Sequence, residues 1–315
     1  MENIKRRPVL EHLTFSGKFW VLILLFVFCL SIFSLLAAAV MIPFAGIHDL
    51  SDLSKINDYN NPNVLVGLKV AQTISAIGSF VLPSFVFAFL VSSNSTGYLK
   101  LNVSLKLKSL VIVFLVMISV LPFINWLGEL NSKMVLPDFL SDVEQWMKTY
   151  EEQAKQLTEA FLKMNGIGDL IINLFVIAFL AAFSEELLFR GVIQKLLMDW
   201  KKNTHFAIWI TAIIFSAFHV QFYGFIPRMI LGALMGYLFQ WSGSIWLSVF
   251  AHFVNNAFAV VVEYMTSKNI ISPEVESVGE GGNTILVASS VLITLFFLTM
   301  VYRFEKSKNL ESFNL

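Results

Sequence analysis

Eight long apolar runs dominate this sequence and limit what it can fold into. Each is long enough to cross, or nearly cross, the hydrocarbon core of a bilayer, for which a helix needs about 20 apolar residues. They cover residues 19–42, 66–91, 109–128, 170–190, 206–221, 225–241, 244–263 and 284–302. A helix satisfies its own backbone hydrogen bonds inside lipid, so the sequence predicts an all-α, polytopic membrane bundle of about eight transmembrane helices.

The composition agrees with this prediction. Hydrophobic residues make up 57% of the 315 residues and charged residues 14%, whereas soluble domains carry about 25% charged residues. The 22 basic and 22 acidic residues cancel, so nothing indicates nucleic acid as a partner, and the lipid bilayer is the expected one. The single cysteine, Cys29, excludes an intramolecular disulfide. The first run is too long for a signal-peptide core and is expected to be retained.

The charges between the runs predict an orientation. Basic residues favour the cytoplasmic ends of membrane helices. In an eight-helix topology the acidic loops near 49–58 and 264–283 share one side of the membrane, and four basic clusters share the other side. These clusters contain Lys5, Arg6, Arg7 and Lys18; Lys100, Lys106 and Lys108; Lys195, Lys201 and Lys202; and Arg303, Lys306 and Lys308. Both termini are therefore expected in the cytoplasm, and in a bacterium the membrane would be the plasma membrane.

An amphipathic segment lies between the third and fourth runs. Apolar residues recur at helical spacing from Phe139 to Met164, with acidic residues and lysines between them, which predicts a helix lying along the outer interface. The chain then divides into four parts. These are three N-terminal helices (1–128), the outer linker helix (129–167), a four-helix core (168–263), and a loop with the last helix and a cytoplasmic tail (264–315).

Few strongly polar side chains fall at membrane depth, and such residues usually mark function. They are Glu185, Glu186, Arg190, His219, His252, Asn255 and Asn256. Glu186 and Arg190 are four residues apart with the acid first, which predicts an ion pair. Glu185 points about 100° away around the helix and needs a partner from another run. His252 and Asn256 share one helix face.

Helical rise gives approximate depths for these groups. Counted from the nearest cytoplasmic ends at 1.5 Å per residue, Glu185 lies about 15 Å deep, His252 about 12 Å and His219 about 21 Å. A tilted or re-entrant path for the short run 206–221 would bring His219 level with the others. The sequence thus predicts one buried polar site that opens towards the cytoplasmic half.

The residue types indicate peptide hydrolysis. Neighbouring carboxylates in a low dielectric resist ionising together, so one must be protonated or compensated by Arg190. A glutamate beside a histidine can take a proton from water, either free or bound to a metal, for attack on a carbonyl. His252 and Asn256 can donate hydrogen bonds to the resulting oxyanion.

Other protease classes fit the sequence less well. Gly166 to Asp169 has the Gly-x-Gly-Asp pattern of aspartyl intramembrane proteases, but no second aspartate lies within an apolar run. Ser244 follows Gly243 at an expected cytoplasmic turn, where no histidine is level with it. The His-Glu-x-x-His signature of zincins does not occur.

Three segments together resemble a known family. Glu185 to Arg190 (EELLFR), Phe215 to His219 (FSAFH) and His252 to Asn256 (HFVNN) are similar in order and spacing to the motifs of the CAAX protease and bacteriocin-processing family. Those motifs read Glu-Glu-x-x-x-Arg, Phe-x-x-x-His and His-x-x-x-Asn/Asp. The family includes the type II CAAX prenyl endopeptidases, bacterial intramembrane proteases and bacteriocin-immunity proteins.

The resemblance implies a role for each motif residue. Glu185, assisted by His219, would activate the water. Glu186 and Arg190 would shape and neutralise the site, and His252 and Asn256 would stabilise the oxyanion. A zinc ion on Glu185, His219 and His252 would make the protein a metalloprotease. A metal-free glutamate protease is the alternative, and it is slightly favoured.

The expected function is an intramembrane endopeptidase acting on a membrane-associated peptide or protein. A CAAX-like C-terminus, a leader peptide and a membrane-protein segment all remain open as substrates. The first three helices and the last are expected to pack around the core and to control lateral substrate entry. The alternative function is a non-enzymatic scaffold, immunity protein or transporter that uses the buried polar cluster.

Overall fold

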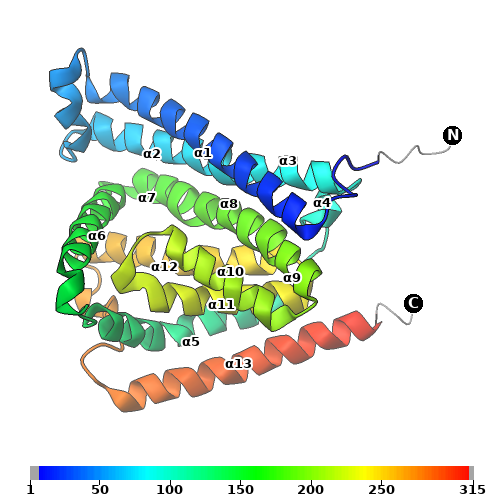
Figure 1. The fold of residues 1–315 in the computed structure, drawn as a ribbon. Helices are drawn as coiled ribbons and strands as arrows, with labels where there is room; N and C mark the ends of the chain where they lie inside the picture. Colours follow the sequence, from blue (N-terminus) through cyan, green and yellow to red (C-terminus); the bar gives the residue numbers. More distant parts are fainter. Residues whose placement is uncertain (1–6, 312–315) are drawn as a thin grey trace.

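A computed structural model describes residues 7–311, which form helices and turns without any strand. The helices lie side by side in a membrane-type bundle (Figure 1). The predicted all-α class is therefore confirmed. Lys5 and Arg6 of the first basic cluster lie outside the described residues, as does the end of the tail from 312 to 315.

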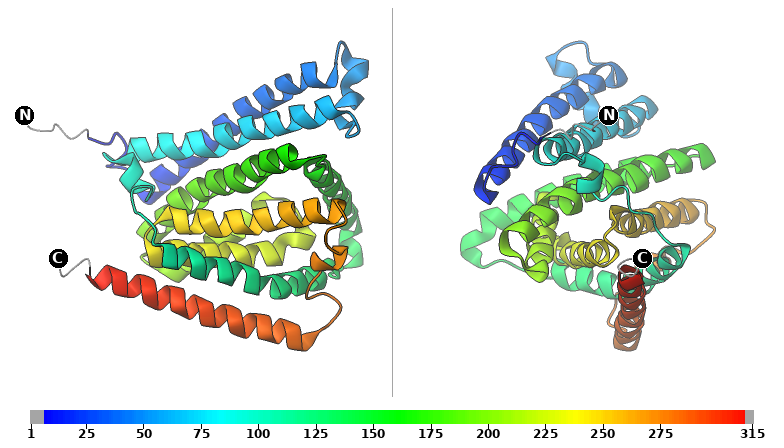
Figure 2. Two further views of the ribbon diagram at one scale, coloured as in Figure 1. Left: turned by 180° about the vertical axis from the view of Figure 1, so that it is seen from behind. Right: turned by 90° about the vertical axis from the view of Figure 1, so that its right-hand side faces the viewer.

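The N-terminal helices form a layer on one side of the bundle (Figures 1 and 2). Helix α1 (Phe15–Ala45) ends at Gly46, whose left-handed conformation caps it. After the 3₁₀ turn η1 (Leu50–Asn57), Asn61 caps α2 (Pro62–Ala76), which begins with a proline at its first position. A π turn, η2 (Ile77–Val81), joins α2 to α3 (Leu82–Val91), and the short α4 (Ser95–Tyr98) follows.

Seven longer helical elements make up the rest of the described chain. Helix α5 (Leu107–Ser132) leads through η3 (Asp138–Leu140) to α6 (Ser141–Leu162). One continuous helical path then contains α7 (Ile167–Asn173), η4 (Leu174–Leu180), α8 (Ala181–Leu188), η5 (Phe189–Gln194) and α9 (Lys195–Lys201). The remaining elements are α10 (Thr204–Phe218), η6 (Phe222–Gly224), α11 (Phe225–Ser242), α12 (Ile245–Ser267), η7 (Pro273–Val275) and α13 (Thr284–Glu311).

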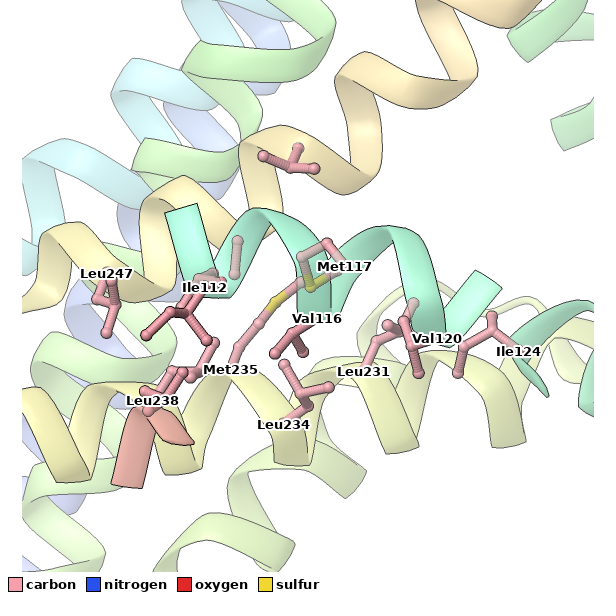
Figure 3. Packing of buried hydrophobic residues seen from close by; sticks show 14 residues of the cluster. Ile112, Val116, Met117, Val120, Ile124, Leu231, Leu234, Met235, Leu238 and Leu247 are labelled. Atoms are coloured by element: carbon pink, nitrogen blue, oxygen red, sulfur yellow. The ribbon is translucent and has the colours of Figure 1, made fainter. Parts of the chain in front are cut away.

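Two apolar clusters hold the layers together. One joins α5, α11, α12 and α13 through residues such as Val116, Leu234 and Met235 (Figure 3). The other joins the N-terminal layer to α8, η5 and α9, with Phe87 and Leu187 fully buried. The four-helix core is thus enclosed between α1–α3 on one side and α5 with α13 on the other.

The number of membrane-crossing helices differs from the prediction. Within residues 7–311, seven helical segments are long and apolar enough to cross a membrane. The eighth predicted run is α10, whose 15 residues rise only about 22 Å. It stops because Val220 adopts a left-handed φ of 53°, a strained conformation for a β-branched residue. Seven spans and one shorter apolar helix therefore replace the expected eight.

The two ends of the bundle are different. Both termini lie at one end, while α6 and the loops 46–61 and 268–283 lie at the other (Figure 1). Helix α6 crosses that end and matches the predicted amphipathic helix, with Met147 and Ala160 buried. Trp146 is 56% exposed, and its ring lies 6.0 Å from that of Tyr150, which is also exposed. Helix α6 therefore covers one end of the core.

Candidate active site

Glu186 and Arg190 form an ion pair in the centre of the bundle. Arg190 Nη1 donates to Glu186 Oε1 at 2.8 Å, and both side chains have no exposed surface. Arg190 Nη2 also donates to the carbonyl of Gly232 on α11 at 2.8 Å. The pairing expected from their four-residue spacing is therefore present, and it is anchored to a neighbouring helix.

Side chains of helix α12 also contact the Glu186 carboxylate. His252 Nδ1 lies 3.0 Å from Glu186 Oε1, and Ser248 Oγ donates to Glu186 Oε2. Because a carboxylate only accepts hydrogen bonds, Nδ1 of His252 carries the proton in this contact. The buried negative charge is thus fully hydrogen-bonded. Ser248 was not among the predicted site residues, although its position four residues before His252 puts it on the same helix face.

Glu185 points in a different direction from Glu186. Its side chain is 19% exposed, and its Oε2 lies 3.8 Å from His252 Nε2. That buried oxygen has no hydrogen-bond partner among the residues that the structure describes. His252 therefore stands between the two glutamates, with one ring nitrogen towards each.

His219 lies at the end of α10, next to the strained Val220. Its Nδ1 lies 2.8 Å from the carbonyl of Phe215, so Nδ1 is the donor and the Nε2 lone pair is left available. Glu185, Arg228 and His252 lie close enough for their charges to act on this ring. His219 is thus placed to accept a proton near Glu185.

Phe215 of the second motif connects these groups. Its ring centroid lies 4.9 Å from the Arg190 guanidinium carbon and 4.9 Å from the His219 ring. The His252 ring is 5.8 Å away and nearly perpendicular, at 84°. This aromatic side chain fixes the positions of three polar groups without competing for their hydrogen bonds.

The two asparagines of the third motif lie beside the histidine. Asn256 Nδ2 donates to the carbonyl of Ile177 at 3.3 Å, and Asn255 Nδ2 donates to Asn256 Oδ1 at 3.2 Å. These contacts fix which way the Asn256 amide faces. One of its two N–H groups is left to donate to a ligand.

A cavity of about 360 Å³ adjoins this group of residues. It is lined by Gln72, Leu157, Thr158, Phe161, Leu162, Ile177, Ala181, His219 and Asn256. Four of these residues belong to α6, so the cavity lies at the α6 end of the bundle, away from both termini (Figure 1). It will be called the site cavity.

The prediction that the site opens towards the end with the termini is therefore wrong. Its depth count began at Lys195, but the helix continues to Lys201, which places Glu185 about 24 Å from that end. Helix α10 starts at the same end and stops at His219, about 22 Å further on. The two residues are level, and what lies beyond them is α6.

The predicted zinc ligands do not form a metal centre. Within residues 7–311, no three His, Cys, Asp or Glu side chains are grouped so that they could hold a metal ion. Of the proposed set Glu185, His219 and His252, both histidines direct Nδ1 at protein oxygens, so Nε2 is the ring nitrogen that each has left for a ligand. The three side chains are not grouped as metal ligands, and no catalytic step is assigned to a metal.

Two glycines let the charged helix approach α11 closely. Arg190 donates to the carbonyl of Gly232, and Gln194 donates to that of Gly236 at 3.1 Å. A Cβ atom on Gly236 would lie 2.9 Å from Gln194 Oε1 and 3.0 Å from Ile208. These two glycines were not predicted as part of the site, although Gly-x-x-x-Gly is a recognised packing pattern of membrane helices.

Comparison with known proteins identifies a family that the segment carrying the site resembles. Residues 167–258, which contain all three motifs, match the family model described as "Type II CAAX prenyl endopeptidase Rce1-like". The resemblance predicted from the motifs is therefore confirmed over this segment. No solved structure matches the chain.

Two proteins of Bacillus subtilis (strain 168) are similar to part of the chain. "Uncharacterized protein YpbD" is 31% identical over 99 residues, which are 30% of this chain and 48% of that protein. "Putative membrane peptidase YdiL" is 28% identical over 90 residues, which are 29% of this chain and 36% of that protein. The chain thus matches less than half the length of either relative. With the apolar helices, the comparisons indicate an integral membrane protein of a protease type, and they do not support the metalloprotease alternative.

Proposed function

We propose that this protein is an intramembrane endopeptidase that hydrolyses a peptide bond with water activated by Glu185 and His219. The strongest support for this proposal comes from the environment of Glu185. Glu185 Oε2 is buried and has no hydrogen-bond partner among the described residues, yet it faces His252 at 3.8 Å. A buried carboxylate oxygen is costly to leave without a partner, and a water molecule would satisfy it. The resemblance of residues 167–258 to an endopeptidase family supports the same function.

The first chemical step is attack by water. Water bound between Glu185 and the Nε2 lone pair of His219 gives up a proton to this pair, and its oxygen attacks the carbonyl carbon of the substrate. The carbonyl π electrons move to oxygen and form a tetrahedral oxyanion. Collapse of this intermediate breaks the C–N bond, and the same proton passes to the leaving amine.

The oxyanion is stabilised by His252 and Asn256. Because His252 Nδ1–H is directed at Glu186, Nε2 can donate a hydrogen bond only if the ring is doubly protonated. Fixed donors in such a dry site stabilise developing negative charge more strongly than water does.

The substitution Glu185→Gln tests this function. It removes the base and scarcely changes side-chain volume, so we expect loss of proteolysis while the protein still inserts and folds. Proteomics of membrane fractions from cells with the wild type or Glu185→Gln would identify fragments that disappear. Glu11→Gln is the matched control, because Glu11 is exposed at the opposite end of the bundle, and it should change no fragments.

A non-enzymatic role would give a different result. If wild type and Glu185→Gln produce the same fragments although both are correctly folded, the endopeptidase function is wrong. The buried polar cluster would then belong to a scaffold, an immunity protein or a transporter.

A further inference from the structure

Two cavities meet at Leu157 of α6. The first is the site cavity, which contains His219 and Asn256. The second, of about 570 Å³, lies between α6 and the turn after η1, and it will be called the polar cleft. Leu157 lines both. The two spaces therefore adjoin at Leu157, between the surface of the α6 end and the site.

The linings of the two spaces have different chemistry. The polar cleft presents uncharged amide and phenol groups, from Asn57, Tyr59, Tyr150, Gln153 and Gln156. Amide side chains both donate and accept hydrogen bonds, as the groups of an extended peptide backbone require. The site cavity beyond Leu157 is mainly apolar, with Phe161, Leu162, Ile177 and Ala181. This order of linings suits a peptide whose backbone stays solvated in the polar cleft and whose side chains are buried in the site cavity.

Side-chain hydrogen bonds hold α6 above this path. Lys163 Nζ donates to the carbonyl of Tyr59 at 3.0 Å, across the polar cleft region. Asn173 Nδ2 donates to the carbonyl of Phe161 at 2.8 Å, and the backbone N–H of Tyr223 donates to Glu151 at 3.2 Å. These contacts tie α6 to the N-terminal layer, to α7 and to η6. The path therefore runs between α6 and the N-terminal layer.

The charge pattern assigns this end of the bundle to a side of the membrane. The opposite end carries Lys100, Lys106, Lys108, Lys195, Lys201 and Lys202. The loops at the α6 end carry Asp49, Asp52, Asp58, Glu274, Glu276 and Glu280. Lysine and arginine near the ends of membrane helices favour the cytoplasm. The mouth of the polar cleft then faces away from the cytoplasm.

On the basis of the endopeptidase function proposed above, we propose that the substrate is a peptide segment exposed on the non-cytoplasmic face of the membrane. It reaches Glu185 through the polar cleft beneath α6. Leader peptides and membrane-protein segments on that face satisfy this requirement. A CAAX-like C-terminus in the cytoplasm lies on the wrong side of the membrane for this route.

Cysteine labelling tests the route without any knowledge of the substrate. The only native cysteine is Cys29, so Cys29→Ala gives a background to which single cysteines are added. The added residues are Ala181→Cys in the site cavity, Gln153→Cys in the polar cleft and Lys202→Cys at the opposite end. A membrane-impermeant maleimide added to intact cells should label the first two. Lys202→Cys should be labelled only after permeabilisation.

The controls distinguish an error in the proposed route from an error in the proposed membrane orientation. Total reactivity after denaturation corrects for differences in expression and folding. Adding Leu157→Trp, which blocks the junction of the two cavities, should abolish labelling of Ala181→Cys but not of Gln153→Cys. If Ala181→Cys is labelled only from the same side as Lys202→Cys, the proposed route is overturned. If Gln153→Cys requires permeabilisation, the proposed orientation is overturned.

Mapping of cleavage sites tests the substrate class. Fragments that depend on Glu185 should come from cuts in segments on the non-cytoplasmic side of membrane proteins or in their outer membrane halves. Cuts confined to cytoplasmic segments would overturn the substrate class and leave the endopeptidase function intact. If no cut depends on Glu185, the proposed function fails and the substrate class fails with it, while the labelling still reports on the path.

Discussion

At the scale of single residues, two neighbouring glutamates have different environments. Glu186 accepts hydrogen bonds from Arg190, Ser248 and His252 and has no exposed surface. Glu185 is 19% exposed and keeps an oxygen without a hydrogen-bond partner among the described residues. The first carboxylate serves as a fixed charge, because both of its oxygens already accept hydrogen bonds from the protein. The second retains a lone pair for chemistry.

Removing Arg190 should destabilise the protein. Arg190→Ala leaves the Glu186 carboxylate buried with its main counter-charge missing, and breaking a buried pair in this way costs about 3–5 kcal/mol. We expect a lower unfolding temperature in detergent and loss of activity. Lys202→Ala is the matched control, because that side chain is 78% exposed. Unchanged stability of Arg190→Ala would contradict a structural role for the pair.

Ser248 should act through Glu186 and His252. Ser248→Ala removes one donor to a buried carboxylate, which costs about 1–3 kcal/mol, and it loosens the group that orients His252. We therefore expect a fall in kcat that exceeds any change in KM. Ser242→Ala is the control, since this buried hydroxyl contacts only backbone groups near the end of α11, donating to the Leu238 carbonyl and accepting from the Ser244 N–H. Equal loss of activity in both variants would show that Ser248 is merely structural.

At the scale of elements, π turns and glycines shape the helix that carries the glutamates. The π turns η4 and η5 flank α8 on either side, and such turns are frequent at functional sites in helices. Arg190 and Gln194 lie in η5 and donate to carbonyls of Gly232 and Gly236 on α11. The close approach of these two helices holds the guanidinium against Glu186.

A methyl group on Gly236 should disturb this approach. In Gly236→Ala the new Cβ would lie 2.9 Å from Gln194 Oε1 and 3.0 Å from Ile208, and such overpacking costs about 1–3 kcal/mol. Thermal unfolding in detergent would measure it. Gly128→Ala is the control, since nothing lies within 4 Å of its Cβ and alanine favours a helix interior by about 1 kcal/mol. If the two variants had the same unfolding temperature, the close packing would have no energetic role.

At the scale of the whole molecule, the site cavity lies on the α6 side of the buried ion pair. The N-terminal layer and α6 border the site cavity, in which Gln72 of α2 faces residues of α6, α10 and α12. Packing of the first three helices against the core was expected from the sequence. The participation of α6 was not, because its amphipathic pattern indicated only an interface helix.

Activity should not depend on a metal ion. No three ligating side chains among residues 7–311 are grouped for a metal, so Glu185, His219 and His252 do not form a ligand set. We expect chelators to leave proteolysis unchanged and elemental analysis of the purified protein to find no stoichiometric zinc. Inactivation by a chelator that is reversed by added zinc would contradict the metal-free mechanism.

The sequence by itself determined the features that follow from local geometry. Apolar length predicted the membrane helices, and four-residue spacing predicted the pair of Glu186 with Arg190 and the common face of His252 and Asn256. These relations hold in any α-helix, because 3.6 residues per turn fixes which side chains are neighbours. The three motifs likewise indicated the family that residues 167–258 resemble.

Only the tertiary structure decided the depth of the site and the direction in which it opens. Val220 follows the end of α10 at His219, and the helix of Glu185 continues to Lys201, so these two residues are level deep in the bundle and the site cavity lies on their α6 side. Contacts between segments far apart in the sequence bring three further residues to the site, namely Ser248, Gly232 and Leu157. Periodicity within one helix carries no information about where a neighbouring helix stops or what covers its end, because packing between helices settles both.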